Sequence, residues 1–256
     1  KEALKEVQAI DYPAPQDWDE TSADVIEESL VIDDAHWREI KTFCKQQRII
    51  PAIYFRSLYG FLLARWCQPT AAFSLIDVQS GRFKEHMRAV GCYYHQVPVI
   101  FPSLLDLEEQ TLAEYMAYMK YYLRQLGDMS RLSVDRQRQL LPAEKVRFFY
   151  NYYHFSSNVE FLDDSARLTL YPQKTSEEQV YLVVQDELHS ATLRLMFSPQ
   201  RFVGKSLTQR LLQLSRQCVT LVDSDPLSRL SLWLPEEEDL PLLNPKDHVL
   251  EQSSRI

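Results

Sequence analysis

The sequence predicts an α/β protein in which one mixed β-sheet is packed with helices. Apolar residues recur at helical spacing in residues 112–126 and 202–222, whereas strand-like runs occur at 25–32 and 191–197. The two kinds of segment alternate along the 256 residues in the order β-α-α-β-β-α-(α)-β-β-β-β-α, without an internal repeat. A single domain with helices packed on a mixed sheet fits this order best.

The chain up to residue 101 is expected to contain three strands and two long helices. The strands are expected at residues 25–32, 71–78 and about 93–101. Asp33 and Asp34 follow the first strand and are suited to cap a helix. Pro51 suits the first position of the next helix, which extends to Trp66. Because this second helix has almost no polar face, we expect it to be buried.

The chain after residue 101 is richer in strands. Leu112–Leu126 is a clean amphipathic helix with Gly127 as a cap, and a shorter helix is expected at 134–141. The expected strands are 146–155, 167–171, 180–184 and 191–197. A long helix from Phe202 to about Val222 follows the strands. In domain terms, residues 1–20 form an extended lead-in, residues 21–234 the folded unit, and residues 235–256 an acidic tail or linker.

Composition and charge exclude several classes of function. A net charge of −8 and an isoelectric point near 5.3 give the chain no attraction to nucleic acid or to an anionic membrane. No apolar run approaches the ~18 residues of a membrane span, and the first residues form no signal core, so we expect a cytoplasmic protein. The five glycines cannot form a phosphate-binding loop or a dinucleotide fingerprint. The widely spaced Cys44, Cys67, Cys92 and Cys218 are expected to be buried and reduced.

The six histidines contain no local metal-binding motif, because no two of them lie three to five residues apart. His36 is expected to face solvent in the first turn of its helix. His86 lies in a polar stretch between strands, and His189 is interpreted as part of a turn. His154 is interpreted as a core histidine satisfied by one hydrogen bond, with a functional role as the alternative.

His95 and Gln96 form a polar pair inside an apolar strand that begins after Gly91 and stops at Pro98. Polar side chains in such a strand must find partners or face a cavity or tunnel. A lone histidine there could act as a general base. No carboxylate is placed by the sequence to orient His95, so a structural role is the leading interpretation.

Two short motifs lie around this strand, namely Ser80-Gly81-Arg82 and Gly91-x-Tyr93-x-His95-Gln96-Val97-Pro98-Val99. With the order of elements, they resemble the C-terminal half of a condensation domain from a nonribosomal peptide synthetase. Members of that family typically show a Ser-Gly-Arg turn and then a strand of the form Gly-x-Phe-x-Asn-Thr-Leu-Pro-Leu-Arg. The resemblance covers roughly residues 15–240 and implies a single lobe with a chloramphenicol-acetyltransferase-like fold.

The resemblance also implies roles for individual residues. The positions implied to be structural, fixing the turn and the end of the strand, are Gly81, Arg82, Gly91 and Pro98. The positions implied to line the tunnel between two lobes are Tyr93, His95 and Gln96. No catalytic residue, metal or bound cofactor is implied for this chain, since phosphopantetheine would be carried by a partner carrier domain.

The departures from the family pattern are as informative as the matches. The catalytic signature His-His-x-x-x-Asp-Gly is not found in this sequence, which has no Asp-Gly dipeptide. His95 and Gln96 replace the usual Asn-Thr, and Ile100 stands where an arginine is usual. A complete family member has two lobes, so the resemblance implies that residues 21–234 form one lobe without the catalytic half.

Three hypotheses follow. In the first, the chain is a non-catalytic scaffold or docking lobe for the N-terminal lobe, a carrier protein or other synthetase domains, in the biosynthesis of a peptide such as an antibiotic or siderophore. In the second, it is a small stand-alone acyltransferase that uses His95 or His154 as a base. In the third, it is one part of a split condensation enzyme completed by a partner. Isolation of a lobe would expose an apolar face, so self-association is also expected.

Overall fold

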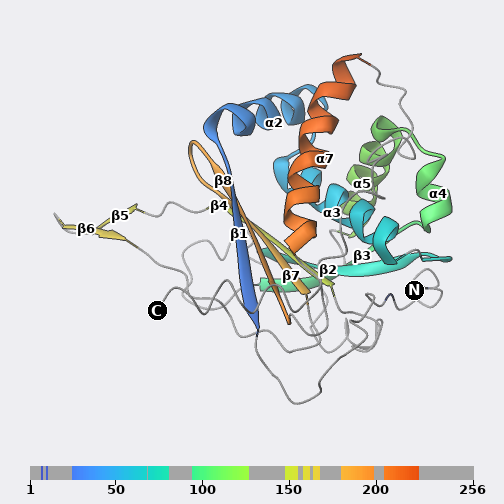
Figure 1. Ribbon diagram of the computed structural model, residues 1–256, viewed down its shortest axis with the longest axis horizontal. Coiled ribbons are helices and arrows are strands. Elements are labelled where there is room, and N and C mark those ends of the chain that lie inside the picture. Colours follow the sequence, from blue (N-terminus) through green and yellow to red (C-terminus); the bar gives the residue numbers. More distant parts are fainter. Residues whose placement is uncertain are drawn as a thin grey trace.

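The computed structural model describes residues 7, 10, 25–67, 69–80, 94–126, 148–154, 158–161, 164–167, 180–198 and 205–224 (Figure 1). The elements of the first half are β1 (Ile26–Ile32), α2 (Asp34–Gln46), α3 (Pro51–Cys67), β2 (Phe73–Ser80), β3 (Tyr94–Phe101), α4 (Leu104–Glu108) and α5 (Leu112–Leu126). Those of the second half are β4 (Phe148–His154), β5 (Asn158–Phe161), β6 (Asp164–Arg167), β7 (Val180–Asp186), β8 (Ala191–Phe197) and α7 (Lys205–Ser224).

The main sheet has six strands in the order β1-β8-β7-β4-β2-β3. The pairs β2–β4 and β4–β7 are parallel, whereas β1–β8, β7–β8 and β2–β3 are antiparallel. The predicted mixed sheet is therefore confirmed. Helices α2, α3, α5 and α7 lie together on one face of the sheet, and the β5–β6 hairpin projects away from it (Figure 1).

The two helices at the start of the chain form for the reasons that the sequence indicates. The side chain of Asp33 caps α2 by accepting a hydrogen bond of 2.9 Å from the backbone N–H of His36. Pro51 begins α3, where the missing N–H costs no helical hydrogen bond. Every residue of α3 from Ile53 to Ala64 is buried, so the expected burial of this helix is confirmed.

The main core lies between the helices and the sheet. Alternate strand residues face the helices, among them Phe73 and Leu75 of β2 and Leu193 and Leu195 of β8. Gly60 allows α3 to approach the ring of Phe101 so closely that a β-carbon would overlap that ring. Two residues of the expected lead-in are also buried: Val7, at 2% exposure, packs with Ile76, Ile100 and Phe149 on the opposite face, and Ile10, at 4%, joins the main core.

Some elements differ from the expectation. The short helix α4 was not expected, because five residues are too few to show an apolar period, although Ser103 caps it. The weakly patterned hairpin β5–β6 was also not expected, and β6 ends at Arg167. Expectations for Gly127, residues 134–141, 168–171 and the tail 235–256 lie outside the described residues.

Candidate functional site

One edge of the sheet brings together two of the histidines singled out in the sequence, His95 and His154. Because β2, β4 and β7 run parallel, their carboxyl ends at Ser80, His154 and Asp186 meet at the same edge. Strand β3 is antiparallel to β2, so its first residues, including His95, start at this edge. The carboxyl edge of parallel strands is a common place for ligand sites in open α/β sheets.

The structure describes only part of the predicted tunnel lining and motif. His95, Gln96 and Pro98 lie in β3, whereas Gly81, Arg82, Gly91 and Tyr93 lie outside the described residues. His95 is half-buried, and its Nδ1 atom is covered by protein without a hydrogen-bond partner. Pro98 does not end the strand, which continues to Phe101. An edge strand tolerates a proline because only one of its sides is paired.

A buried polar cluster lies next to His95 on the side of the sheet that faces the helices. Gln79 of β2 pairs with His95 across the two strands and donates a hydrogen bond of 2.9 Å to Asp77. Asp77 also accepts a hydrogen bond from Arg56 of α3, with which it forms an ion pair. The Nε and Nη2 atoms of Arg56 are buried without partners. The sequence analysis missed this pair, although a charged residue in an almost wholly apolar helix was a usable signal.

His154 is not the core histidine expected from the sequence. Its side chain is 68% exposed, at the last residue of β4. The Nδ1 atom lies 3.3 Å from Oδ2 of Asp186, its register neighbour on β7. The same carboxylate oxygen accepts a hydrogen bond of 2.7 Å from the hydroxyl of Tyr152. Sequence reasoning missed Asp186 as a partner, because 32 residues separate it from His154 and only strand pairing unites them.

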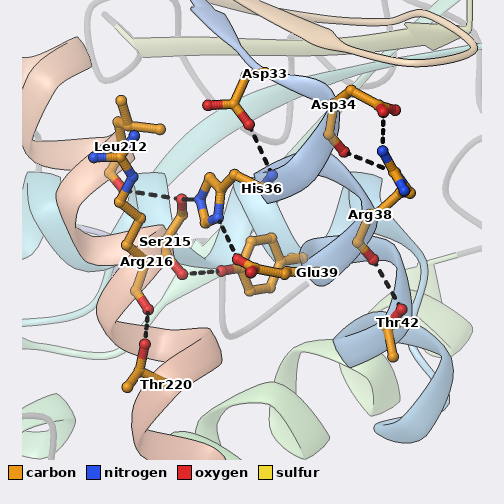
Figure 2. A network of polar contacts seen from close by, with 11 residues as sticks. Asp33, Asp34, His36, Arg38, Glu39, Thr42, Leu212, Ser215, Arg216 and Thr220 are labelled. Atoms are coloured by element: carbon orange, nitrogen blue, oxygen red, sulfur yellow. Dashed lines mark hydrogen bonds and ion pairs between the residues drawn. The ribbon is translucent and has the colours of Figure 1, made fainter.

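The expectation that His36 faces solvent is wrong, because α7 packs over the first turn of α2. The imidazole is buried at 6% exposure and lies between α2 and α7, as Figure 2 shows. Its Nε2 atom is 2.9 Å from the hydroxyl of Ser215, and its Nδ1 atom is 3.2 Å from the carboxylate of Glu39. Ser215 is fully buried and donates a hydrogen bond to the carbonyl of Leu212. Such a serine cannot meet a substrate, so this network joins two helices.

The remaining polar candidates agree with a structural interpretation. His189 lies in the turn between β7 and β8, is 77% exposed and lies 3.6 Å from Asp34. Cys44 and Cys218 are buried free thiols, as expected, whereas Cys67 is only half-buried and Cys92 lies outside the described residues. Burial raises the pKa of Cys44 to about 12. Within the described ranges, no three His, Cys, Asp or Glu side chains are grouped to hold a metal ion.

A groove of about 550 Å³ lies at the opposite edge of the sheet, where β3 ends. Phe101 and Tyr118 form part of its wall together with Asp106, Glu109 and Glu114. The carboxylates of Asp106 and Glu114 already accept hydrogen bonds within helix caps. Asp106 bonds to Ser103 at the start of α4, and Glu114 bonds to Thr111 at the start of α5. His95, Gln96 and Pro98 do not line this groove.

Exposed apolar side chains are scattered over the described surface. The large ones are Val31, Ile50, Leu105, Tyr121 and Leu188, and each comes from a different strand, helix or turn. By themselves they do not outline the apolar lobe face expected from the sequence, so self-association stays a prediction. None of the helices described in the structure is long and apolar enough to cross a membrane.

No protein-family model and no curated protein matches the chain, but solved structures do. A four-domain nonribosomal peptide synthetase, holo-AB3403 bound to AMP and glycine, matches with a TM-score of 0.68 and 14% identity over 90% of this chain and 19% of that chain. The condensation domain of the Monacolin K polyketide synthase MokA has a TM-score of 0.66 and 15% identity over 87% of this chain and 55% of its own. The X-domain from teicoplanin biosynthesis has a TM-score of 0.65 and 12% identity over 90% and 55%.

These likenesses define the class of fold. The chain has the α/β fold of condensation domains, of the chloramphenicol acetyltransferase type, with a mixed six-stranded sheet packed by helices. It spans about half the length of the condensation-domain and X-domain chains that it matches.

Proposed function

We propose that this chain is the C-terminal lobe of a nonribosomal peptide synthetase condensation domain, a lobe that does not join substrates alone and serves as a scaffold or docking surface. The observation that carries the proposal is that the structural likeness extends over most of this chain but over only about half of a condensation domain. The likeness to the MokA domain takes in 87% of this chain but 55% of that domain. The missing His-His-x-x-x-Asp-Gly signature fits a lobe without the catalytic histidine.

The positions of the motifs support assignment to the C-terminal half. Ser80, the first residue of the Ser-Gly-Arg motif, ends β2, and the motif strand from Tyr94 forms β3 beside it. The pairing of these two strands is consistent with what the resemblance implies. Tyr93, His95 and Gln96 are accordingly proposed to lie along the tunnel that a second lobe would complete.

The proposed partners are the N-terminal lobe, neighbouring synthetase domains and a carrier protein that bears phosphopantetheine, in the biosynthesis of an antibiotic-like or siderophore-like peptide. One structural neighbour is an X-domain in complex with OxyB, which supports a docking role for the fold. The β5–β6 hairpin is a separate two-stranded sheet, and the outer backbone of such a hairpin can pair with a strand of another domain.

The proposal is tested by mixing the chain with a separately expressed N-terminal lobe that carries the His-His-x-x-x-Asp-Gly loop. We expect a stable complex in size-exclusion chromatography. Amide or ester formation by the chain alone on carrier-bound substrates would contradict the proposal, and so would a failure of the two lobes to associate at micromolar concentration.

The split-enzyme alternative predicts more than association. Amide formation should appear only in the mixture and should vanish when the signature histidine of the partner is replaced by alanine. For the stand-alone acyltransferase alternative, His154 is the better placed base, because its Nδ1 atom lies 3.3 Å from the Asp186 carboxylate, whereas Nδ1 of His95 is buried without a hydrogen-bond partner among the described residues. Retained acyl transfer in both H95A and H154A would end that alternative.

A further inference from the structure

The groove at the end of β3 takes no part in the function proposed above. It has a volume of about 550 Å³, within the range of ~300–1,000 Å³ that is typical of ligand sites. It lies at Phe101, whereas His95 and the proposed tunnel lining lie at the other end of the same strand. A second lobe placed along the tunnel would therefore leave this groove open to a different partner.

The groove is negatively charged. Asp106, Glu109 and Glu114 line it, and all three are exposed. In the described part of the chain, no lysine, arginine or histidine is among the lining residues. The amino end of α5 adds only about half a positive charge, so the groove remains clearly negative. A surface of this kind is complementary to a cationic partner.

Two of these carboxylates are held in place and still have an oxygen available. Oδ2 of Asp106 accepts a hydrogen bond of 2.6 Å from the Ser103 hydroxyl. Oε2 of Glu114 accepts hydrogen bonds of 2.9 Å from the backbone N–H and from the hydroxyl of Thr111, and these lower the pKa of Glu114. Within the described residues, Oδ1 of Asp106 and Oε1 of Glu114 accept no hydrogen bond. Carboxylates that are already ordered lose little side-chain freedom on binding.

The apolar part of the wall suits a guanidinium group better than an ammonium group. Ala72, Pro102 and Tyr118 line the groove and are half-buried, and the ring of Tyr118 is stacked on Tyr122 with the centroids 6.0 Å apart. A guanidinium is planar, stacks on aromatic rings and donates paired hydrogen bonds to carboxylates. The carbonyl oxygen of Gln110, another lining residue, has no partner and can turn toward a donor without losing a hydrogen bond.

We propose that this groove binds an arginine-bearing peptide segment of a neighbouring protein domain. The arginine side chain lies along Tyr118 and donates hydrogen bonds to Asp106 and Glu114, while Glu109 adds electrostatic attraction. An acidic segment would be repelled, and a purely apolar one would cover the free carboxylate oxygens without giving them a donor. This inference goes beyond the proposed function, because it assigns a partner chemistry to a surface away from the tunnel.

The test measures peptide binding to the full chain by fluorescence anisotropy. The probe is a fluorescein-labelled hexapeptide with two arginines among glycines, and matched peptides carry lysines or glutamates instead. The titrations are made at pH 7.5 and about 50 mM salt, where exposed charges are only weakly screened. We expect the arginine peptide to bind several-fold more tightly than the lysine peptide, and we expect no binding of the glutamate peptide.

Neutralising the groove should weaken the binding of the arginine peptide. In D106N/E109Q/E114Q we expect a loss of affinity on the order of tenfold. Each replacement keeps the shape of the side chain and an oxygen that can accept the capping hydrogen bonds. E109Q alone changes no side chain of either cap and should weaken binding about two- to threefold. Thermal melting by circular dichroism checks that the variants are folded.

Two controls separate the groove from the net charge of the chain and from arginine preference in general. E236Q/E237Q/E238Q removes the same number of charges from the acidic run near the end of the sequence and should leave the affinity unchanged. Y118L should abolish the preference for arginine over lysine. Y118F keeps the aromatic ring and should keep that preference.

Each contrary outcome overturns the proposal. Unchanged affinity in D106N/E109Q/E114Q or in E109Q would show that the peptide binds elsewhere. An equal loss in the control with the three tail substitutions would assign binding to net charge. Equal affinity for the arginine and lysine peptides would contradict the assigned partner chemistry. Association with the second lobe should be the same in D106N/E109Q/E114Q, so this inference and the proposed function fail independently.

Discussion

Arg56 of α3 and Asp77 of β2 form an ion pair inside the core, with side chains that are only 2% and 8% exposed. The pair joins a helix that is otherwise apolar on almost every side to the strand that leads to the sheet edge. Burying two charges is costly unless each remains paired, so the two residues must act as a unit.

Removing one partner should therefore be more harmful than removing both. We expect R56M to lower the free energy of unfolding by about 3–5 kcal/mol, because the Asp77 carboxylate is left buried without a cation. The double variant R56M/D77L should recover most of that loss. Urea denaturation of the unaltered chain, R56M, D77L and the double variant measures the coupling, and strictly additive losses would show that the pair is not a unit.

The contact between His36 and Ser215 should contribute measurably to the packing of α2 on α7. S215A leaves the buried Nε2 atom of His36 without a partner, which should cost about 1–3 kcal/mol of unfolding free energy. T220A is the control, because Thr220 is exposed on the same helix and its hydroxyl donates a hydrogen bond to the Arg216 carbonyl (Figure 2). Its effect should stay within about 0.5 kcal/mol. Similar losses in both variants would assign the effect to the helix rather than to His36.

Gly60 should not tolerate a larger side chain. A β-carbon at this position would overlap the ring of Phe101, so G60A should destabilise the protein by about 1–3 kcal/mol or more. F101L makes room at the same place but leaves a cavity of its own. In the double variant G60A/F101L the loss should therefore be smaller than the sum of the two single losses. Thermal melting of all four proteins provides the comparison.

The buried thiols should make the free energy of unfolding decrease at alkaline pH. Burial raises the folded-state pKa of Cys44 from the ordinary 9.0 to about 12, so the unfolded chain ionises first. Below pH 9 the Cys44 thiol is protonated in both the folded and the unfolded chain, so its contribution to the free energy of unfolding stays constant. Between pH 9 and 12 the thiol ionises in the unfolded chain but not in the folded one, and the free energy of unfolding should fall. C44A should flatten this part of the stability profile relative to the unaltered chain. An equally steep loss in C44A would assign the pH dependence to other groups.

Much of the fold was predictable because local chemistry and apolar spacing determine it. Asp33 and Pro51 begin two helices for reasons that operate within a few residues. The amphipathic helix Leu112–Leu126 has the bounds that its apolar stripe indicated. The short helix α4 was not predicted, because a helix of about one turn is too short to show an apolar period.

The candidate site was less predictable, because its contacts join residues that are distant in the sequence. The sequence by itself determined the kinds of element, their order, the burial of α3 and the absence of the His-His-x-x-x-Asp-Gly signature. Only the tertiary structure decided that His36 is buried against Ser215 and that His154 is exposed beside Asp186. The reason is physical. Apolar periodicity within one helix or strand shows which of its faces is buried, but the polar residues that contact that element come from other parts of the sequence. Strand order and helix packing determine which of those residues they are.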